Sequence, residues 1–148
     1  MQLVPVAPPA QVQIFSGFDY VVTDADRRRV YAAHTGSDAL LVVSADTGKV
    51  LGQIDVGGPL HGVAPDPQTG HVYMGDGLAR TVSEVDPVTM TVVRTASVGG
   101  NVDAISYDPV LHRIYADEDD DTHPLQYDAQ YHVLLIGGKN GTLVSYTP

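Results

Sequence analysis

The sequence predicts an all-β chain of four-stranded antiparallel blades of the β-propeller type, because its residue pattern repeats every 42 positions. Asp24, Asp66 and Asp108 stand 42 residues apart, and each precedes a Val-Tyr or Ile-Tyr pair by six positions. Each full repeat also holds four short apolar segments separated by turn residues. A period of roughly 40 to 45 residues with four strands is typical of a propeller blade, which buries its faces only against neighbouring blades.

The first two repeat units are complete. In unit one, residues 18–58, strands are predicted at Tyr20–Thr23, Arg29–His34, Ala39–Ser44 and Val50–Val56. Unit two, residues 59–100, repeats this order with turn-forming residues at the same places. No segment shows helical periodicity, so an all-β fold has no competitor. Tyr31, Tyr73 and Tyr115 recur at one position of the second strand, where we predict that they pack between blades.

The third unit, residues 101–121, is incomplete. Its first two strands are predicted at Ala104–Tyr107 and Arg113–Ala116, but the next repeat begins only 20 residues after Asp108. The acidic run Asp117–Asp121 stands where two outer strands belong. We interpret this run as a solvated loop, with loose Ca²⁺ binding or repulsion of wrongly pairing strands as alternatives.

The fourth unit, residues 122–148, supplies three strands. They are predicted at Pro124–Tyr127, Val133–Gly137 and Thr142–Tyr146, and Gln11–Phe15 is predicted to complete the blade as its outer strand. The chain would then hold about 3.5 blades, whereas propellers typically have four to eight. We therefore expect ring closure or edge protection to involve a second copy, in a homo-oligomeric ring or a filament.

Composition limits the classes of partner. The formal net charge is −10, from 8 Lys and Arg against 18 Asp and Glu. This balance argues against nucleic acid or an anionic membrane as a partner, since both require a basic face. No apolar run approaches the roughly 20 residues that span a bilayer, and the N-terminal segment lacks the pattern of a signal peptide. Without cysteine, the chain has no disulfide or thiolate chemistry.

Three segments resemble the blades of the YVTN-type β-propeller repeat family: FDYVVTDADRRRVYAAH, LHGVAPDPQTGHVY and GGNVDAISYDPVLHRIY. With the TGKVLGQIDVGG segment they cover most of residues 18–116 and, more weakly, the last unit. The resemblance implies a propeller of about seven blades and a periplasmic or extracellular location, but no particular reaction. This chain differs from the family in having about half that length and in lacking two strands of its third unit.

One position of the repeat gathers residues with ligand chemistry. The innermost strands open, five residues before each turn aspartate, with Asp19, His61, Asp103 and His123. Innermost strands line a propeller's channel, so we predict that these four side chains meet at one mouth as a ligand site. Imidazole and carboxylate groups are suitable ligands for a divalent metal ion. Alternatively, the four residues cap the channel through hydrogen bonds between blades and to water.

Two functional hypotheses follow. The first is a non-enzymatic propeller module that acts in self-assembly or binding, needs no cofactor and takes a small-molecule ligand that the sequence does not identify. The second is a metal-dependent propeller enzyme of the lactonase or lyase type, with an axial cation at the four predicted residues. We assign no catalytic residue, because the chain has no Gly-x-Ser-x-Gly elbow and no cysteine nucleophile.

Overall fold

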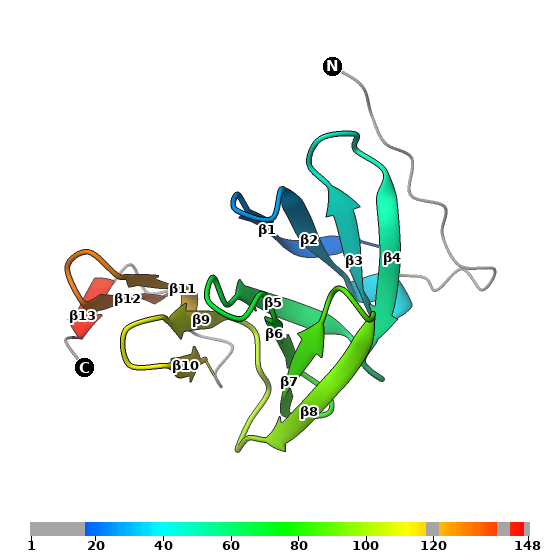
Figure 1. Cartoon of the computed structure of the whole chain (residues 1–148). Coiled ribbons are helices and arrows are strands. Elements are labelled where there is room, and N and C mark those ends of the chain that lie inside the picture. The colour runs from blue at the N-terminus through cyan, green and yellow to red at the C-terminus, as the bar shows by residue number, and fades with distance from the viewer. Residues whose placement is uncertain (1–16, 118–121, 139–142, 147–148) are drawn as a thin grey trace.

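The computed structural model describes residues 17–117, 122–138 and 143–146 of the chain, which form four antiparallel sheets (Figure 1). We number these sheets as blades 1 to 4. Blade 1 holds β1 (Phe18–Asp24), β2 (Arg29–His34), β3 (Ala39–Ser44) and β4 (Val50–Asp55), with the short 3-10 helix η1 (Thr35–Ser37) after β2. Blade 2 holds β5 (Leu60–Pro65), β6 (Val72–Asp76), β7 (Thr81–Asp86) and β8 (Thr91–Ser97).

The last two blades are shorter. Blade 3 consists of β9 (Ile105–Asp108) and β10 (Arg113–Ala116), and blade 4 of β11 (Thr122–Asp128), β12 (Val133–Gly138) and β13 (Leu143–Tyr146). In every blade the strands pair in chain order. The prediction of an all-β partial propeller is therefore confirmed. Gln11–Phe15, predicted to complete blade 4, lies outside the described residues.

The register of the repeat is also confirmed. The second strand of every blade has one residue that pairs with the residue just before the turn aspartate. These pairs are Val30 with Thr23, Val72 with Pro65, Ile114 with Tyr107, and Leu134 with Tyr127. The four blades therefore superpose in the inner two strands, including the short third blade.

The turn aspartates close the turns between these inner strands. One carboxylate oxygen accepts a hydrogen bond from a backbone N–H two residues on in three blades: Asp66 from Gln68 (2.8 Å), Asp108 from Val110 (2.8 Å) and Asp128 from Gln130 (2.9 Å). This is an Asx turn, a local bond that replaces a backbone one. The backbone then turns through a left-handed residue at Arg28, Gly70, His112 and His132.

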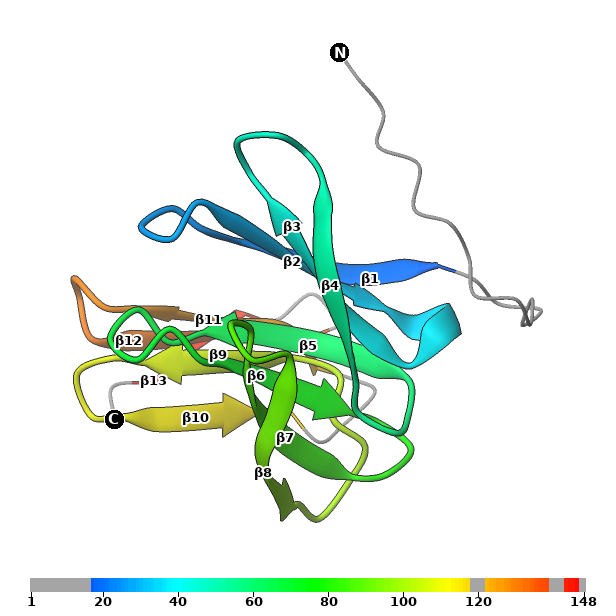
Figure 2. The ribbon, with the colours of Figure 1, turned by 45° about the vertical axis from the view of Figure 1, so that its right-hand side comes forward.

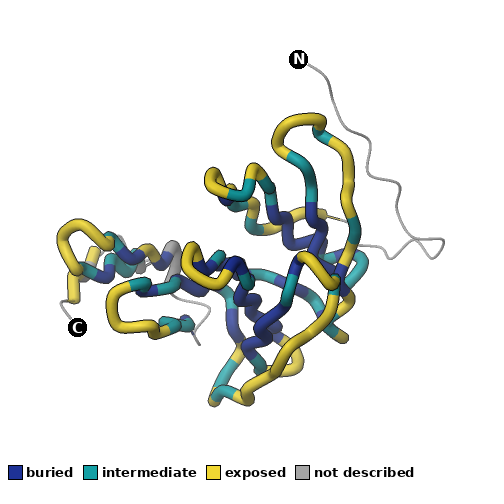
Figure 3. Tube along the Cα trace, in the orientation of Figure 1, coloured by how far each residue is buried: buried dark blue, intermediate teal, exposed yellow. Residues whose placement is uncertain are grey.

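Apolar cores lie between the blades. One buried cluster joins blades 1 and 2 and includes Tyr31, Leu40 and Met74. The next interfaces contain stacked tyrosines, Tyr73 on Tyr107 with ring centroids 5.3 Å apart and Tyr115 on Tyr127 at 6.0 Å. The predicted packing of the repeated tyrosines between blades is therefore confirmed. Figure 3 shows that the buried residues of blades 1 and 2 lie mainly in β2, β3, β5, β6 and β7, whereas the outer strand β8 is exposed along its length.

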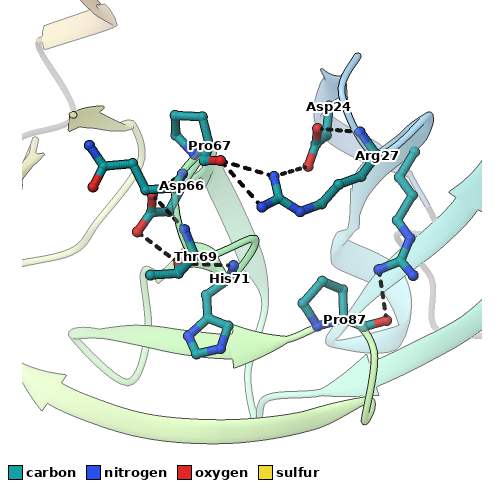
Figure 4. A network of polar contacts seen from close by, with 9 residues as sticks. Asp24, Arg27, Asp66, Pro67, Thr69, His71 and Pro87 are labelled. Atoms are coloured by element: carbon teal, nitrogen blue, oxygen red, sulfur yellow. Dashed lines mark hydrogen bonds and ion pairs between the residues drawn. The ribbon is translucent and has the colours of Figure 1, made fainter.

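Polar contacts join the turns of neighbouring blades (Figure 4). The Arg27 guanidinium donates to the Asp24 carboxylate at 3.3 Å and to the Pro67 carbonyl of blade 2 at 3.2 Å. The Gln68 side chain makes the next link, donating to the Pro109 carbonyl of blade 3 at 3.1 Å. The turn of blade 1 is therefore bonded to that of blade 2, and the turn of blade 2 to that of blade 3.

The inner strands β1, β5, β9 and β11 line a common cavity of 460 Å³ that is open to solvent on one side, where Val21 is 56% exposed. It is lined by Val21–Thr23, Val63–Pro65, Ile105–Tyr107 and Gln126. Figure 2 shows β5, β9 and β11 lying along one another. This cavity is the propeller channel, and its two ends are the places where side chains from several blades can meet.

Candidate functional site

The inner strand pair is irregular at the same place in three blades. The register slips between Phe18 and Val21, between Leu60 and Val63, and between Thr122 and Leu125. Three of the predicted site residues, Asp19, His61 and His123, lie within these irregular segments. Such bulges bend a strand and redirect a side chain. The predicted site therefore coincides with a repeated break in the strand pairing.

A glycine allows the inner strands of blades 2 and 3 to come close at this point. A Cβ atom on Gly62 would lie 2.6 Å from the Ile105 nitrogen and 3.0 Å from the Ala104 carbonyl carbon. Only glycine fits such an approach of two backbones. Because Gly62 follows His61 and Ala104 follows Asp103, this approach brings the imidazole towards the carboxylate.

Three of the four predicted residues meet. His61 Nδ1 lies 2.7 Å from Asp19 Oδ2 and 3.6 Å from Asp103 Oδ1, and one ligand atom from each residue lies within 4.8 Å of the others. Their side chains are 37%, 29% and 23% exposed for Asp19, His61 and Asp103. We call this cluster the axial mouth. His123 lies in β11, and its side chain is outside the part that the structure describes.

The axial mouth lies at the end of the channel where the inner strands begin. On each strand its residue comes two positions before the first channel residue, which is Val21, Val63 or Ile105. The His61 ring also packs against the backbone at Gly77, where a Cβ would lie 3.2 Å from Cδ2 and 3.4 Å from Nε2. The ring is therefore held from one side, with Nδ1 towards the carboxylates.

The pKa of Tyr20 reflects the burial and the negative charge of this site. Burial raises the pKa of its hydroxyl, and the nearby carboxylates of Asp103, Asp19 and Asp117 raise it further. The ring packs against two apolar clusters, one between blades 1 and 2 and one between blades 3 and 4. The axial mouth thus combines negative charge with an apolar wall, an environment that favours a cation.

Asp117 is a member of this environment that sequence reasoning missed. The acidic run was predicted to be a solvated loop, but Asp117 is buried, so that prediction is wrong for its first residue. Its N–H donates to the Ala104 carbonyl at 2.9 Å, and its carbonyl accepts from the Asp103 N–H at 3.3 Å. The repeat holds no hint of this role, because Gly75 occupies the equivalent position in blade 2. Residues 118–121 lie outside the described part of the chain.

Comparisons with known proteins identify the fold and no family. No protein-family model and no curated protein matches the chain. Among solved structures, it is similar to the β-propeller domain of Cps50 (Swd1) from Myceliophteria thermophila, with a TM-score of 0.73 and 11% identity over 93% of this chain. The chain folds as part of a β-propeller.

A second similar structure is Kuenenia stuttgartiensis hydrazine synthase, with a TM-score of 0.69 and 16% identity over 98% of this chain. The chain spans 40% of that protein's length and 54% of the Cps50 domain. At these identities the likeness concerns the fold alone. Within the described residues, no helix has the length and apolar character that crossing a membrane requires.

Proposed function

We propose that this chain is a non-enzymatic β-propeller binding module that holds a divalent cation at its axial mouth. The supporting observation is the convergence of two carboxylates and one imidazole from three successive blades to within 4.8 Å. One nitrogen and two oxygen ligands suit Zn²⁺ and other divalent transition metals. Burial raises the pKa of Tyr20 and the nearby carboxylates raise it further, and this negative charge favours the same occupant.

Cation binding would change the chemistry of His61. In the structure Nδ1 and an Asp19 oxygen lie at hydrogen-bonding distance, 2.7 Å apart, so a proton lies between them. A metal ion on Nδ1 would need that nitrogen unprotonated, so this proton would move to Nε2 or to solvent. Binding would weaken as the pH falls, because a doubly protonated imidazole cannot bind a metal ion. A zinc ion held by these three residues could take a further ligand. Because the channel begins at this mouth, a small polar molecule could be that ligand.

Isothermal titration with Zn²⁺, Mn²⁺ and Ca²⁺ tests the proposal. We expect one cation per chain, and at least about tenfold weaker binding in His61→Ala and Asp103→Asn, a loss of about 1.4 kcal/mol or more. His112→Asn is the matched control, because His112 is an exposed imidazole in a turn of blade 3 and asparagine tolerates its left-handed backbone. Equal affinity in the native chain and His61→Ala would contradict the proposal.

An enzyme of the lactonase or lyase type would use the same cation to polarise a carbonyl oxygen. Such a reaction also needs a proton acceptor near the metal. The raised pKa of Tyr20 makes its hydroxyl a poor base at neutral pH, so a carboxylate of the site would have to serve as the acceptor. Turnover of a lactone by the Zn²⁺-loaded chain, lost in His61→Ala, would favour the enzyme instead.

We also propose that the chain associates with copies of itself through the open side of blade 4. In the described residues β13 pairs only with β12, and Leu143 and Tyr146 on it are 73% and 54% exposed. An unpaired strand edge with apolar side chains attracts a further strand. Sedimentation at micromolar concentration should show a species heavier than the 15.7 kDa chain, and a single monomer would contradict self-association.

The proposal also covers the cellular location of the protein and the class of partner that it binds. The resemblance of the blades to the YVTN-type repeat supports a periplasmic or extracellular protein. The net charge of −10 supports a partner other than nucleic acid or an anionic membrane surface. Fractionation of the native host, with the chain detected by antibody, tests the location.

A further inference from the structure

The outer edge of β10 is recessed between two larger blades. Blade 3 has two strands in the described part of the chain, and only residues 117–121 separate β10 from β11. Blades 2 and 4 on either side have four and three strands (Figure 1). With about 4.8 Å between strands, the space beside β10 is one to two strands deep. We call this space the blade 3 slot.

The backbone of β10 directs hydrogen-bonding groups into the slot. The Asp117 N–H donates to the Ala104 carbonyl on the inner side at 2.9 Å, so Asp117 points its backbone groups inward. In an antiparallel strand, successive residues direct these groups to opposite sides. Ala116 and Ile114 therefore present N–H and C=O groups to the slot.

The two walls of the slot differ in polarity. On the side of blade 2 is a mainly apolar groove of 330 Å³, lined by Val82, Ala96, Val98, Ile114 and Ala116 together with Tyr73, Glu84 and Arg94. On the side of blade 4 is a mixed groove of 540 Å³, lined by Leu125, Leu134 and Ile136 and also by Tyr115 and Asp117. A strand added to β10 would therefore meet apolar side chains on each of its faces, with charged groups beside them.

We propose that the blade 3 slot accepts an extended strand donated by another polypeptide, which pairs antiparallel with β10. Pairing of a peptide with an open sheet edge is a common mode of recognition, in which backbone bonds provide affinity and side-chain pockets provide specificity. The inference goes beyond cation binding and does not depend on it.

The walls define the chemistry of this strand. The corresponding strands of blades 1 and 2 are buried in two ways. In β3 of blade 1, residues Ala39, Leu40, Leu41 and Val42 are 0%, 0%, 2% and 0% exposed. In β7 of blade 2, Ser83 and Glu84 are also buried, but both have side-chain partners within blade 2. A strand that brings no such partners needs an apolar run like that of β3, because buried polar groups without partners are costly. The β10 strand of a second copy does not fit, because it is recessed in the same way.

A peptide with the sequence of residues 37–56, which contains β3 and β4, tests the proposal on the full chain. We expect saturable binding of the fluorescently labelled peptide. We also expect hydrogen exchange of the Ile114 and Ala116 amides, followed by NMR, to slow at least about tenfold when it binds. A matched peptide with Leu40→Asp and Leu41→Asp places a charge against each wall and should bind at least about tenfold more weakly.

Variants of the chain test the backbone contact. Ala116→Pro removes an N–H that faces the slot and leaves the pairing with β9 intact, because proline is tolerated where the N–H faces outward. Ala116→Ser keeps the N–H with a side chain of similar size. We expect the proline variant to lose peptide binding and the serine variant to retain it. If the proline variant does not fold, the exchange measurement on the native chain still decides whether the peptide pairs with β10.

Three results would overturn the inference. The first is equal peptide binding by the native chain and Ala116→Pro. The second is unchanged hydrogen exchange at Ile114 and Ala116 with the peptide bound. The third is protection of these amides in the free chain that disappears on dilution. The third result would show that a second copy occupies the slot.

Discussion

Blades 2 and 3 each have the same kind of inner strand pair, but they differ in the strands that follow it. Blade 2 continues through β7 and β8, and β7 is buried along four of its six residues. Blade 3 ends at β10, yet its inner pair keeps the register, the turn aspartate and the stacked tyrosine of the repeat. The inner strands therefore build the channel and its mouth, whereas the outer strands supply apolar contact between blades and protect the sheet edge.

The inner pairs are linked from blade to blade by an aspartate and a tyrosine. Burial alone would raise the pKa of Asp66, but hydrogen bonds from Thr69, Gln68 and Tyr107 hold it below its usual value. Burial and the charge of Asp66 raise the pKa of Tyr107 to about 12. Asp108 of blade 3 relates to Tyr127 of blade 4 in the same way. The link from blade 3 to blade 4 thus survives the loss of the outer strands.

The largest expected effect comes from the contact between blades 2 and 3. Gly62→Ala would place a methyl group 2.6 Å from a backbone nitrogen of blade 3, and we expect it to lower the free energy of unfolding by about 3 kcal/mol. Gly17→Ala is the matched control, because a Cβ there meets nothing within 4 Å. Urea unfolding measures both. Similar stabilities for the two variants would show that the inner strands are not held this closely.

The two faces of β7 allow the same substitution to be compared. Val85 is fully buried in the core shared with blade 1, whereas Val82 borders the open groove beside β10. We expect Val85→Ala to cost about 2 kcal/mol and Val82→Ala less than about 1 kcal/mol, because the second leaves no closed cavity. Equal losses in urea unfolding would indicate that the groove is filled in solution.

Alkaline pH should weaken the aspartate–tyrosine link. A tyrosine in the unfolded chain titrates near 10, and Tyr107 in the folded chain at about 12. Its stabilisation is therefore present below pH 10 and is lost as the pH rises from 10 to about 12. Urea unfolding across this range should show a smaller pH dependence in Tyr107→Phe than in the native chain. An identical dependence would mean that other groups cause it.

Acid should weaken the same link from the other side. Because the pKa of Asp66 is lowered in the folded chain, its stabilisation is present above about pH 4 and is lost as the pH falls through the folded value. Asp66→Asn should reduce the slope of stability against pH below about pH 4. An unchanged slope in Asp66→Asn would show that Asp66 does not cause the loss of stability in acid.

The smallest expected effect is at the turns. Gln68 bonds to the Pro109 carbonyl of blade 3, whereas the equivalent Val110 of blade 3 is exposed and apolar. Gln68→Ala should cost about 0.5–1 kcal/mol, the usual net value of one hydrogen bond. Thermal unfolding of Gln68→Ala beside Val110→Ala would show whether this bond adds stability.

The fold could be predicted from the sequence because each repeat unit contains the same turn-forming and strand-forming residues. Turn aspartates, apolar strands and paired tyrosines depend on residues close in sequence, and β2 and β3 begin and end at the predicted residues. The 42-residue register also predicted that Asp19, His61 and Asp103 share one place on successive inner strands. Neither inference required knowledge of how the blades pack.

What the repeat could not predict depends on breaks in it. The bulges at Asp19 and His61 recur at one place of the repeat, but no residue type in the sequence marks them. The close approach at Gly62 is a contact between blades, which the repeat pattern does not contain. Asp117 has no acidic counterpart in the repeat, because Ala33 and Gly75 occupy the equivalent positions of blades 1 and 2. The open grooves beside β10 likewise arise from strands that are missing rather than from residues that are present.

Paramagnetic broadening by Mn²⁺ tests the cation site most directly. At substoichiometric Mn²⁺, the amide signals of Tyr20, Gly62 and Gly77, which surround His61, should broaden first, and His61→Ala should abolish this broadening at the same concentration. Signals of the exposed turn around Tyr131, at the far end of blade 4, should stay sharp. Broadening spread over the acidic surface, or unchanged in His61→Ala, would contradict a cation site at the axial mouth.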